Sequence, residues 1–278
     1  MPRRGVRPAP ASGQRSWRAA GRSVASDSQE RGRDLNRRRR VHVPQQREDD
    51  AIRNGCWVVI AAYREATAIG AVVQGLREHG WRVVVVDDGS ADATAAVARA
   101  AGATVVRHAV NLGQGAALRT GFAFALADPS TRAVVTFDAD GQHAPEAVAA
   151  LLAPLQRGEA DATLGSRFLD PAATADVPPL RRHLLRLATR LARLTTGLPL
   201  TDTHNGLRGF TREALGRLTL TQDRMAHASE ILSQLARHGL RVREVSVAIR
   251  YSEYSVAKGQ RMIDAVTILW DLFLTRAR

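Results

Sequence analysis

The sequence has little cysteine and few aromatic residues, and it has no long apolar run. Cys56 is the one cysteine among 278 residues, which excludes an internal disulfide framework and a cysteine-based metal site. Aromatic residues make up 5% of the chain, so few side chains could stack on nucleic-acid bases. No apolar run reaches the ~20 residues that cross a bilayer. We expect a cytoplasmic protein that can also associate peripherally with the inner face of a membrane.

The positive charge is concentrated at the start of the chain. The formal net charge is +13, and residues 1–50 hold thirteen arginines against six acidic residues, a balance of +7 that leaves +6 for the other 228. This stretch has no apolar period and is rich in Arg, Ser, Pro and Gln. It predicts a disordered, Arg-rich extension over residues 1–54, with a transit peptide as the alternative. Residues 55–278 then form one folded domain.

From residue 57 onward, short β-rich runs alternate with amphipathic helical patterns. Strands are expected at residues 57–62, 82–86, 104–107, 133–137 and 161–165, and helices at 67–79, 91–101, 113–126, 181–194 and 260–276. This order predicts an α/β fold with a mostly parallel central sheet flanked by helices, and with amphipathic helices toward the C-terminus. The helix at 181–194 carries leucines and arginines on different sides. It either packs on the core with a solvated charged face or lies on an anionic membrane surface.

Three polar segments follow the ends of predicted strands. They are VVVVDDGS at 83–90, NLGQGA at 111–116 and TFDADGQH at 136–143. Because an open α/β sheet binds its ligands at the carboxyl ends of its strands, we expect the three segments to share one site.

The third segment predicts a metal site. Asp138 and Asp140 are separated by one residue in a turn, so their carboxylates can converge on Mg²⁺ or Mn²⁺ and leave positions open for phosphate oxygens. Gln142 and His143 are within reach as further ligands.

The first two segments predict contacts with a nucleotide. Asp87 and Asp88 either cap the helix that follows, together with Ser90, or accept hydrogen bonds from a ribose or base. The glycine loop around Gly113 leads into a helix and can offer backbone N–H groups to an anion. A purely structural turn is the alternative for this loop.

Together with Gly165-Ser166-Arg167 and the stretch DTHNGLR at 202–208, these segments resemble family 2 glycosyltransferases with the GT-A fold. The resemblance covers residues 55–278 and is greatest to the dolichol-phosphate-mannose-synthase-like branch. It implies that Tyr63 and Glu65, which match the P-x-Y-N-E motif of the family, hold the nucleotide, and that Asp87 and Asp88 contact its base and ribose. It also implies that Asp138 contacts the nucleotide sugar, that Asp138, Asp140 and Gln142 hold the metal, and that Arg167 and Arg181 meet an acceptor phosphate.

The family resemblance leaves the acceptor open. A hydroxyl acceptor needs a general base, and Glu230 falls where many inverting members carry an acid, although it could be a surface acid on a helix. A phosphate acceptor is already ionised and needs only positive charge, which Arg167, Arg181, Arg208 and the one lysine, Lys258, can supply. Lys258 lies in a segment at 251–260 that is similar to one in bacterial members, or in a solvated loop. Asp140, Arg167 and Glu230 are the candidate catalytic residues.

The sequence therefore predicts an inverting, metal-dependent glycosyltransferase that moves a hexose from a GDP- or UDP-sugar to polyprenyl phosphate. The first alternative is a related enzyme with a hydroxyl acceptor and Glu230 as base. A basic nucleic-acid-binding protein and a non-catalytic nucleotide-binding protein are further alternatives. About half of the excess charge lies in residues 1–50, which speaks against specific nucleic-acid binding by the domain.

Overall fold

A computed structural model describes residues 52–169, 179–203 and 205–249. The segment at 251–260 with Lys258, the helix expected at 260–276 and almost all of the extension at 1–54 lie outside the described residues.

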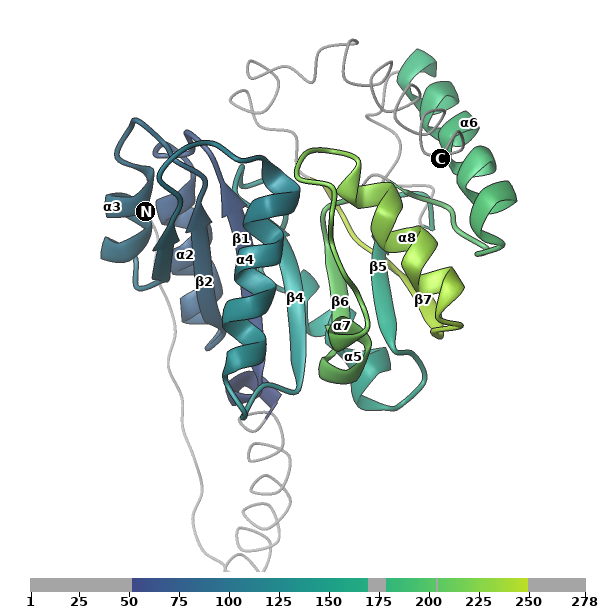
Figure 1. Cartoon of the computed structure of the whole chain (residues 1–278), viewed down its shortest axis with the longest axis horizontal. Coiled ribbons are helices and arrows are strands. Elements are labelled where there is room, and N and C mark those ends of the chain that lie inside the picture. Colours follow the sequence, from purple (N-terminus) through teal and green to yellow (C-terminus); the bar gives the residue numbers. More distant parts are fainter. Residues whose placement is uncertain (1–51, 170–178, 204, 250–278) are drawn as a thin grey trace, which may run out of the picture. The chain divides into compact units, whose positions relative to one another are not determined.

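A sheet of seven strands forms the centre of the described part (Figure 1), in the order β3-β2-β1-β4-β6-β5-β7. The strands are β1 (Cys56–Ala62), β2 (Arg82–Asp87), β3 (Thr104–Arg107), β4 (Ala133–Asp138), β5 (Ala162–Ser166), β6 (Arg208–Thr211) and β7 (Val242–Ser246). Strand β6 runs antiparallel to both of its neighbours, and the other pairings are parallel. The predicted α/β fold with a mostly parallel sheet is confirmed.

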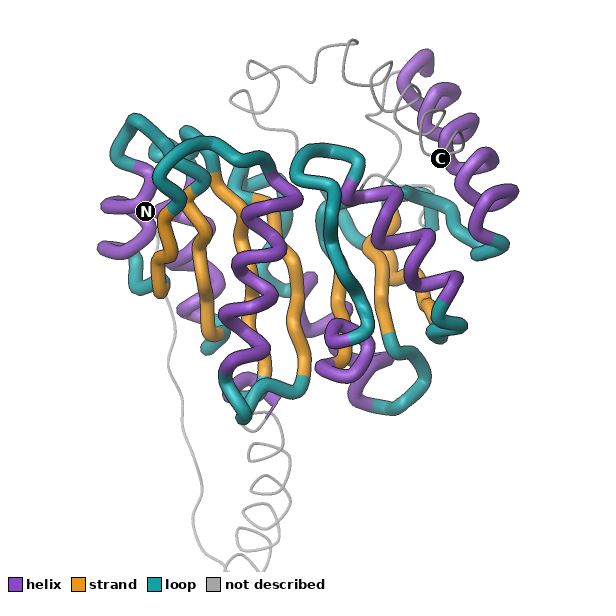
Figure 2. The backbone as a smooth tube through the Cα atoms, in the orientation of Figure 1, coloured by secondary structure: helices purple, strands orange, loops and turns teal. Residues whose placement is uncertain are grey.

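Helices cover both faces of the sheet (Figure 2). The helices on the two faces are α2 (Ile69–Glu78), α3 (Thr94–Ala100), α4 (Gln114–Ala127), α5 (Ala147–Gln156), α7 (Arg212–Gly216) and α8 (His227–Arg237). Helix α6 (Pro179–Thr196) packs against α8 instead. Alternate residues of β1 point to opposite faces. Val58 and Ile60 pack in the core with α2, α3 and α5, and Val59 packs with α4, α7 and α8 on the other face. None of the described helices is long and apolar enough to cross a membrane.

The expected strands agree with β1 to β5 within one residue. The sequence does not predict strand β6, because its residues Arg208 and Gly209 are not typical of strands. Helix α3 also begins later than expected, at Thr94. Ser90 does not cap it, since the Ser90 hydroxyl accepts the N–H of Arg64 at 2.9 Å. Asp92 Oδ1 accepts the Thr94 N–H instead, at 3.1 Å.

Gly121 of α4 lets this helix approach β1 closely. A Cβ at this position would lie 2.3 Å from Val59 Cγ1, and Val59 is fully buried. Gly121→Ala should lower the free energy of unfolding by about 1–3 kcal/mol through overpacking, measured by urea denaturation. Gly216→Ala is the control, because no atom lies within 4 Å of the added Cβ, and it should cost nothing. Equal stability of the two variants would contradict this account of the packing.

Candidate active site

Two adjoining cavities lie at the carboxyl ends of β1, β2 and β4. The larger has a volume of about 400 Å³ and is lined by residues that include Tyr63, Glu65, Asp88 and Gly113. The smaller measures about 240 Å³ and is lined by residues that include Asp138, Asp140, Asn205, Arg208 and His227. Ala61, Gln114 and Met225 line both. A cavity of about 720 Å³ lies at the opposite ends of these strands and contains none of the predicted site residues.

The carboxylate of Asp88 holds the glycine loop in place. Asp88 is buried, and it accepts hydrogen bonds from Asn111 Nδ2 at 2.9 Å, from the Leu112 N–H at 3.0 Å and from the Gly113 N–H at 2.7 Å. The His108 ring adds a fourth contact at 2.7 Å. The anion that this loop binds is therefore Asp88, which favours the structural alternative for the loop. That Gly113 contacts a ligand stays a prediction. Its backbone could approach a ligand closely, but its N–H is already bound to Asp88.

Asp87 is tied to its own turn and to β3. Its Oδ1 accepts the N–H of Ser90 at 3.1 Å, and its Oδ2 forms an ion pair with Arg107 Nε at 3.1 Å that lacks hydrogen-bond geometry. Asp87 is fully buried and lines neither cavity, whereas Asp88 lines the larger one. Their predicted contacts with base and ribose stay predictions.

The loop after β1 is held by the loop after β2. The N–H of Glu65 donates to Thr94 Oγ1 at 2.9 Å, in addition to the bond from Arg64 to Ser90. Arg64 has a φ of +57°, a left-handed conformation in which asparagine is enriched. The family motif has asparagine at the position of Arg64, and asparagine suits this left-handed backbone better than arginine does. The side chains of Tyr63 and Glu65 both reach the larger cavity.

Asp138 and Asp140 lie in different electrostatic surroundings. Asp138 Oδ2 accepts a hydrogen bond from His143 Nε2 at 3.0 Å. Burial acts to raise the pKa of Asp138, but this bond and the charges of His143, Arg208 and Arg167 outweigh it and hold the pKa below its usual range. Burial and the charge of Asp138 raise the pKa of Asp140. His143 was expected within reach as a ligand, and its Nε2 is instead occupied by Asp138.

The donor set fits a hard divalent cation. Asp138 and Asp140 supply carboxylate oxygens. Gln142, whose N–H donates to Asp140 Oδ1 at 3.0 Å, lines neither cavity, and its side-chain amide as a ligand stays a prediction. A Cβ at Gly206 would lie 2.1 Å from Asp138 Oδ1, so this glycine makes room for the carboxylate. The described residues contain no group of three His, Cys, Asp or Glu that could enclose a metal. Two carboxylates with open positions match the way Mg²⁺ is bound together with phosphate oxygens.

Arg208 is buried in the wall of the smaller cavity. Its guanidinium donates to the backbone carbonyls of Ala228 at 3.2 Å and of Thr203 and Asn205 at 3.5 Å. Burial lowers its pKa to about 10, although the charges of Asp138 and Asp202 act in the opposite direction. Arg208 therefore remains charged at neutral pH and places positive charge near Asp138.

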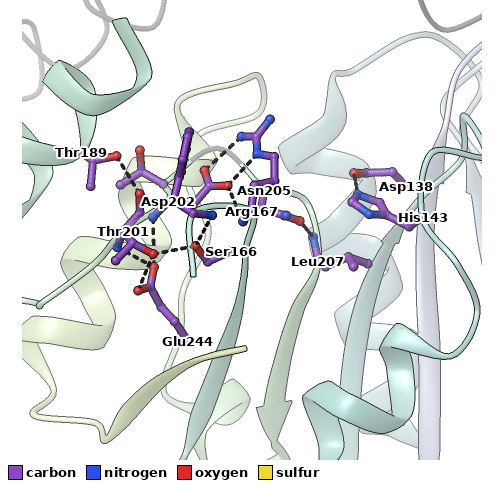
Figure 3. Close-up of polar contacts among 12 residues, drawn as sticks. Asp138, His143, Ser166, Arg167, Thr189, Thr201, Asp202, Asn205, Leu207 and Glu244 are labelled. Carbon is purple, nitrogen blue, oxygen red and sulfur yellow. Dashed lines mark hydrogen bonds and ion pairs between the residues drawn. The ribbon is translucent and has the colours of Figure 1, made fainter. Parts of the chain in front are cut away.

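Arg167 forms an ion pair with Asp202 (Figure 3). Its Nε and Nη2 donate to the two oxygens of Asp202 at 2.7 and 3.0 Å, and both residues are buried. Glu244 of β7 accepts the N–H groups of Thr201 and Asp202 at 2.7 and 3.0 Å and so holds Asp202 in place. The side chain of Arg181 in α6 and the whole of Lys258 lie outside the described part.

Glu230 has a structural role in this geometry. Its carboxylate accepts hydrogen bonds from the N–H of Thr221 at 3.0 Å, the hydroxyl of Thr221 at 2.6 Å and the N–H of Gln222 at 3.1 Å. It lines neither of the two cavities. Glu230 is therefore better explained as the anchor of the segment at 221–222 than as a general base.

Sequence reasoning missed two residues of the smaller cavity. Asn205 lies in the DTHNGLR stretch at 202–208, but the sequence assigns it no role. His227 follows no predicted strand and belongs to no motif named above, so only the folded chain brings it to Asp138 and Asp140.

The glycosyl transferase family 2 sequence model matches residues 57–219. The chain belongs to this family and is a glycosyltransferase. It is 35% identical to an uncharacterized protein of Methanocaldococcus jannaschii, over 79% of this chain and 91% of that protein. It is 30% identical to the polyprenol monophosphomannose synthase of Mycolicibacterium smegmatis, over 72% of this chain and 79% of that protein. The predicted branch of the family is thus supported.

A second characterised relative and a solved structure extend this assignment. The chain is 29% identical to the UDP-N-acetylglucosamine–dolichyl-phosphate N-acetylglucosaminyltransferase of Methanococcus voltae, over 79% of this chain and 95% of that protein. Glucosyl-3-phosphoglycerate synthase of Mycobacterium tuberculosis, crystallised with Mn²⁺, UDP-glucose and phosphoglyceric acid, matches with a TM-score of 0.54 and 25% identity, over 81% of this chain and 82% of that chain. The GT-A fold is confirmed.

Asp88→Asn tests the role of this carboxylate in the scaffold. An amide in its place would turn an NH₂ group toward donors that now bind a charge, so we expect a loss of about 2–4 kcal/mol in the free energy of unfolding. Urea denaturation measures it. Asp223 is the control, because it is 54% exposed in an ion pair with Arg119, and Asp223→Asn should cost less than about 1 kcal/mol. A similarly small loss in both variants would be incompatible with this role for Asp88.

Proposed function

We propose that the protein transfers a hexose from a GDP- or UDP-sugar to polyprenyl phosphate, with inversion at the anomeric carbon and with Mg²⁺ or Mn²⁺. The observation that carries the proposal is the composition of the smaller cavity. Asp138 and Asp140 are its only acidic lining residues in the described part of the chain, and Arg208 faces them. Glu230 is held elsewhere by Thr221 and Gln222. Positive charge without a spare carboxylate to act as base suits an acceptor that is already ionised.

The two named relatives support this choice of acceptor. One is a polyprenol monophosphomannose synthase and the other acts on dolichyl phosphate by its name. For the donor, the larger cavity lies beside Asp88 and Tyr63 and has room for a nucleoside. The enzyme crystallised with UDP-glucose and Mn²⁺ supports a nucleotide sugar and a divalent metal.

The residues of the chain would divide the work as follows. Asp138, Asp140 and Gln142 would hold the metal, which supplies Lewis-acid stabilisation to the leaving diphosphate. Arg208 and Arg167, with Arg181 and Lys258 proposed in addition, would position the acceptor phosphate. A phosphate oxygen forms a bond to the anomeric carbon as the bond from that carbon to the diphosphate breaks. The electron pair leaves with the nucleoside diphosphate, and no proton has to move.

Helix α6 supports peripheral binding to a membrane, where a polyprenyl acceptor resides. Ala188 and Ala192 are buried, and α6 packs against α8. Leu187 and Leu194 are 53% and 83% exposed. Exposed arginines lie near these leucines, namely Arg186, Arg190 and Arg193. Exposed apolar side chains next to arginines fit an anionic lipid surface. We propose a cytoplasmic location at the inner face of the membrane.

A product assay tests the proposal. The full chain is incubated with Mn²⁺, polyprenyl phosphate and a panel of GDP- and UDP-hexoses, and lipid-linked products are identified by mass spectrometry. We expect the mass of a hexosyl phosphate lipid with one donor. The proposal would be contradicted if no lipid phosphate received a sugar while a hydroxyl acceptor did.

Metal binding should depend on pH through Asp140. Because the pKa of Asp140 is raised, protons compete with the metal at a higher pH than they would at an ordinary aspartate. Affinity for Mn²⁺, measured by electron paramagnetic resonance of the free ion, should fall as the pH drops toward the pKa of Asp140 and be restored as the pH rises.

Asp140→Ala should abolish both Mn²⁺ binding and transfer. Transfer at a near-wild-type rate would show that the metal site is assigned wrongly.

Glu230→Gln separates the two acceptor classes. A glutamine retains an oxygen acceptor for Thr221, so we expect kcat with polyprenyl phosphate to change less than about tenfold, with a loss of roughly 1 kcal/mol in stability. If Glu230 were the base for a hydroxyl acceptor, kcat would fall by about 10²–10⁴-fold. Such a fall, in a variant that is still folded at the assay temperature, would favour the hydroxyl alternative.

A further inference from the structure

Two polar side chains in the wall of the smaller cavity have a hydrogen-bonding group without a partner among the described residues, and of these two groups that of Asn205 is buried. Asn205 and His227 are each 5% exposed, and both line the 240 Å³ cavity beside Asp138 and Asp140. A buried polar group that forms no hydrogen bond costs free energy, so unpartnered groups in a native fold call for an explanation.

Asn205 presents a donor. Its Oδ1 accepts the N–H of Leu207 at 2.9 Å, and this bond identifies the other atom of the amide as Nδ2. Nδ2 is buried and has no hydrogen-bond partner among the described residues. The amide is therefore fixed by one end and offers two N–H bonds at the other.

His227 presents an acceptor. Its Nδ1 lies 2.7 Å from the carbonyl oxygen of Arg224, so Nδ1 carries the hydrogen and Nε2 keeps its lone pair. Burial and the charge of Arg208 lower the pKa of His227 to about 4, so the ring is neutral at physiological pH. No described residue bonds to Nε2.

The size and position of the cavity indicate what these groups bind. A volume of 240 Å³ is below the ~300–1,000 Å³ of sites for drug-sized ligands, so it holds a single sugar ring rather than a whole nucleotide sugar. It adjoins the larger cavity at Ala61, Gln114 and Met225. A nucleotide bound in the larger cavity, with its diphosphate at Asp138 and Asp140, would direct its sugar into the smaller one.

We propose that Asn205 and His227 recognise hydroxyl groups of the donor hexose, Asn205 as a hydrogen-bond donor through Nδ2 and His227 as an acceptor through Nε2. A hydroxyl can donate and accept at once, so this pair is complementary to a sugar. The pair selects the donor, because a sugar that lacks a hydroxyl at this position leaves the buried Asn205 Nδ2 unsatisfied and forms no bond with His227 Nε2. This inference rests on the proposed function, in which the donor is a nucleotide sugar.

The test compares binding of nucleotide sugars with that of their nucleoside diphosphates. Affinities are measured by titration calorimetry with Mn²⁺, for UDP against UDP-glucose and UDP-N-acetylglucosamine, and for GDP against GDP-mannose. The variants are His227→Leu and Asn205→Ser, the second of which removes the Nδ2 donor without adding a charge beside Asp138 and Asp140. We expect each to weaken binding of the preferred nucleotide sugar about tenfold and to leave the diphosphate affinity unchanged within about twofold. His227→Gln, which restores an acceptor, should recover part of the loss.

Matched controls separate recognition from folding. His238 is exposed just after α8 and Asn54 is exposed before β1, so His238→Leu and Asn54→Ser should bind as the wild type does. Variants that bind the nucleotide sugar as tightly as the wild type would overturn the inference. So would an equal loss of nucleotide sugar and diphosphate, which indicates a defect in the fold or the metal site. A wild type that binds none of the nucleotide sugars would instead overturn the proposed function.

Discussion

The buried carboxylate of Asp88 is the interaction on which the site depends. It accepts three hydrogen bonds from the loop at 111–113 and contacts His108, and so joins the end of β2 to the start of α4. The same loop packs on the segment at 222–224, where a Cβ at Gly113 would lie 2.4 Å from the carbonyl oxygen of Asp223. One buried charge thus positions the walls of both cavities.

The second organising feature is a balance of charge. Asp138, Asp140 and Arg208 line the smaller cavity, and Arg167 forms an ion pair with Asp202. Without a metal, the two carboxylates repel each other, and burial and this repulsion raise the pKa of Asp140. Such a site favours partners that bring a cation and a phosphate together. The proposed transfer between two phosphorylated molecules follows from this balance.

The sequence predicted β1 to β5, the order of the site segments and the aspartate pair, because alternating patterns and strand-end acids are local signals. It could not predict that the glycine loop binds Asp88, since a row of N–H groups suits any anion. Nor could the sequence show that Glu230 binds the segment at 221–222, because a glutamate looks the same in a sequence whether it acts as a general base or holds a loop. Asn205 and His227 meet only in the folded chain, and Arg208 lies in a strand without a strand pattern.

The central claim is that the acceptor is recognised by its phosphate. The most direct measurement compares polyprenyl phosphate with the polyprenol of the same chain length, under identical conditions and with the donor that the protein uses. We predict transfer of the sugar to the phosphate at a rate at least about 10²-fold higher, because the described cavity offers positive charge and no spare carboxylate base for an alcohol. Equal transfer to the alcohol would contradict the account.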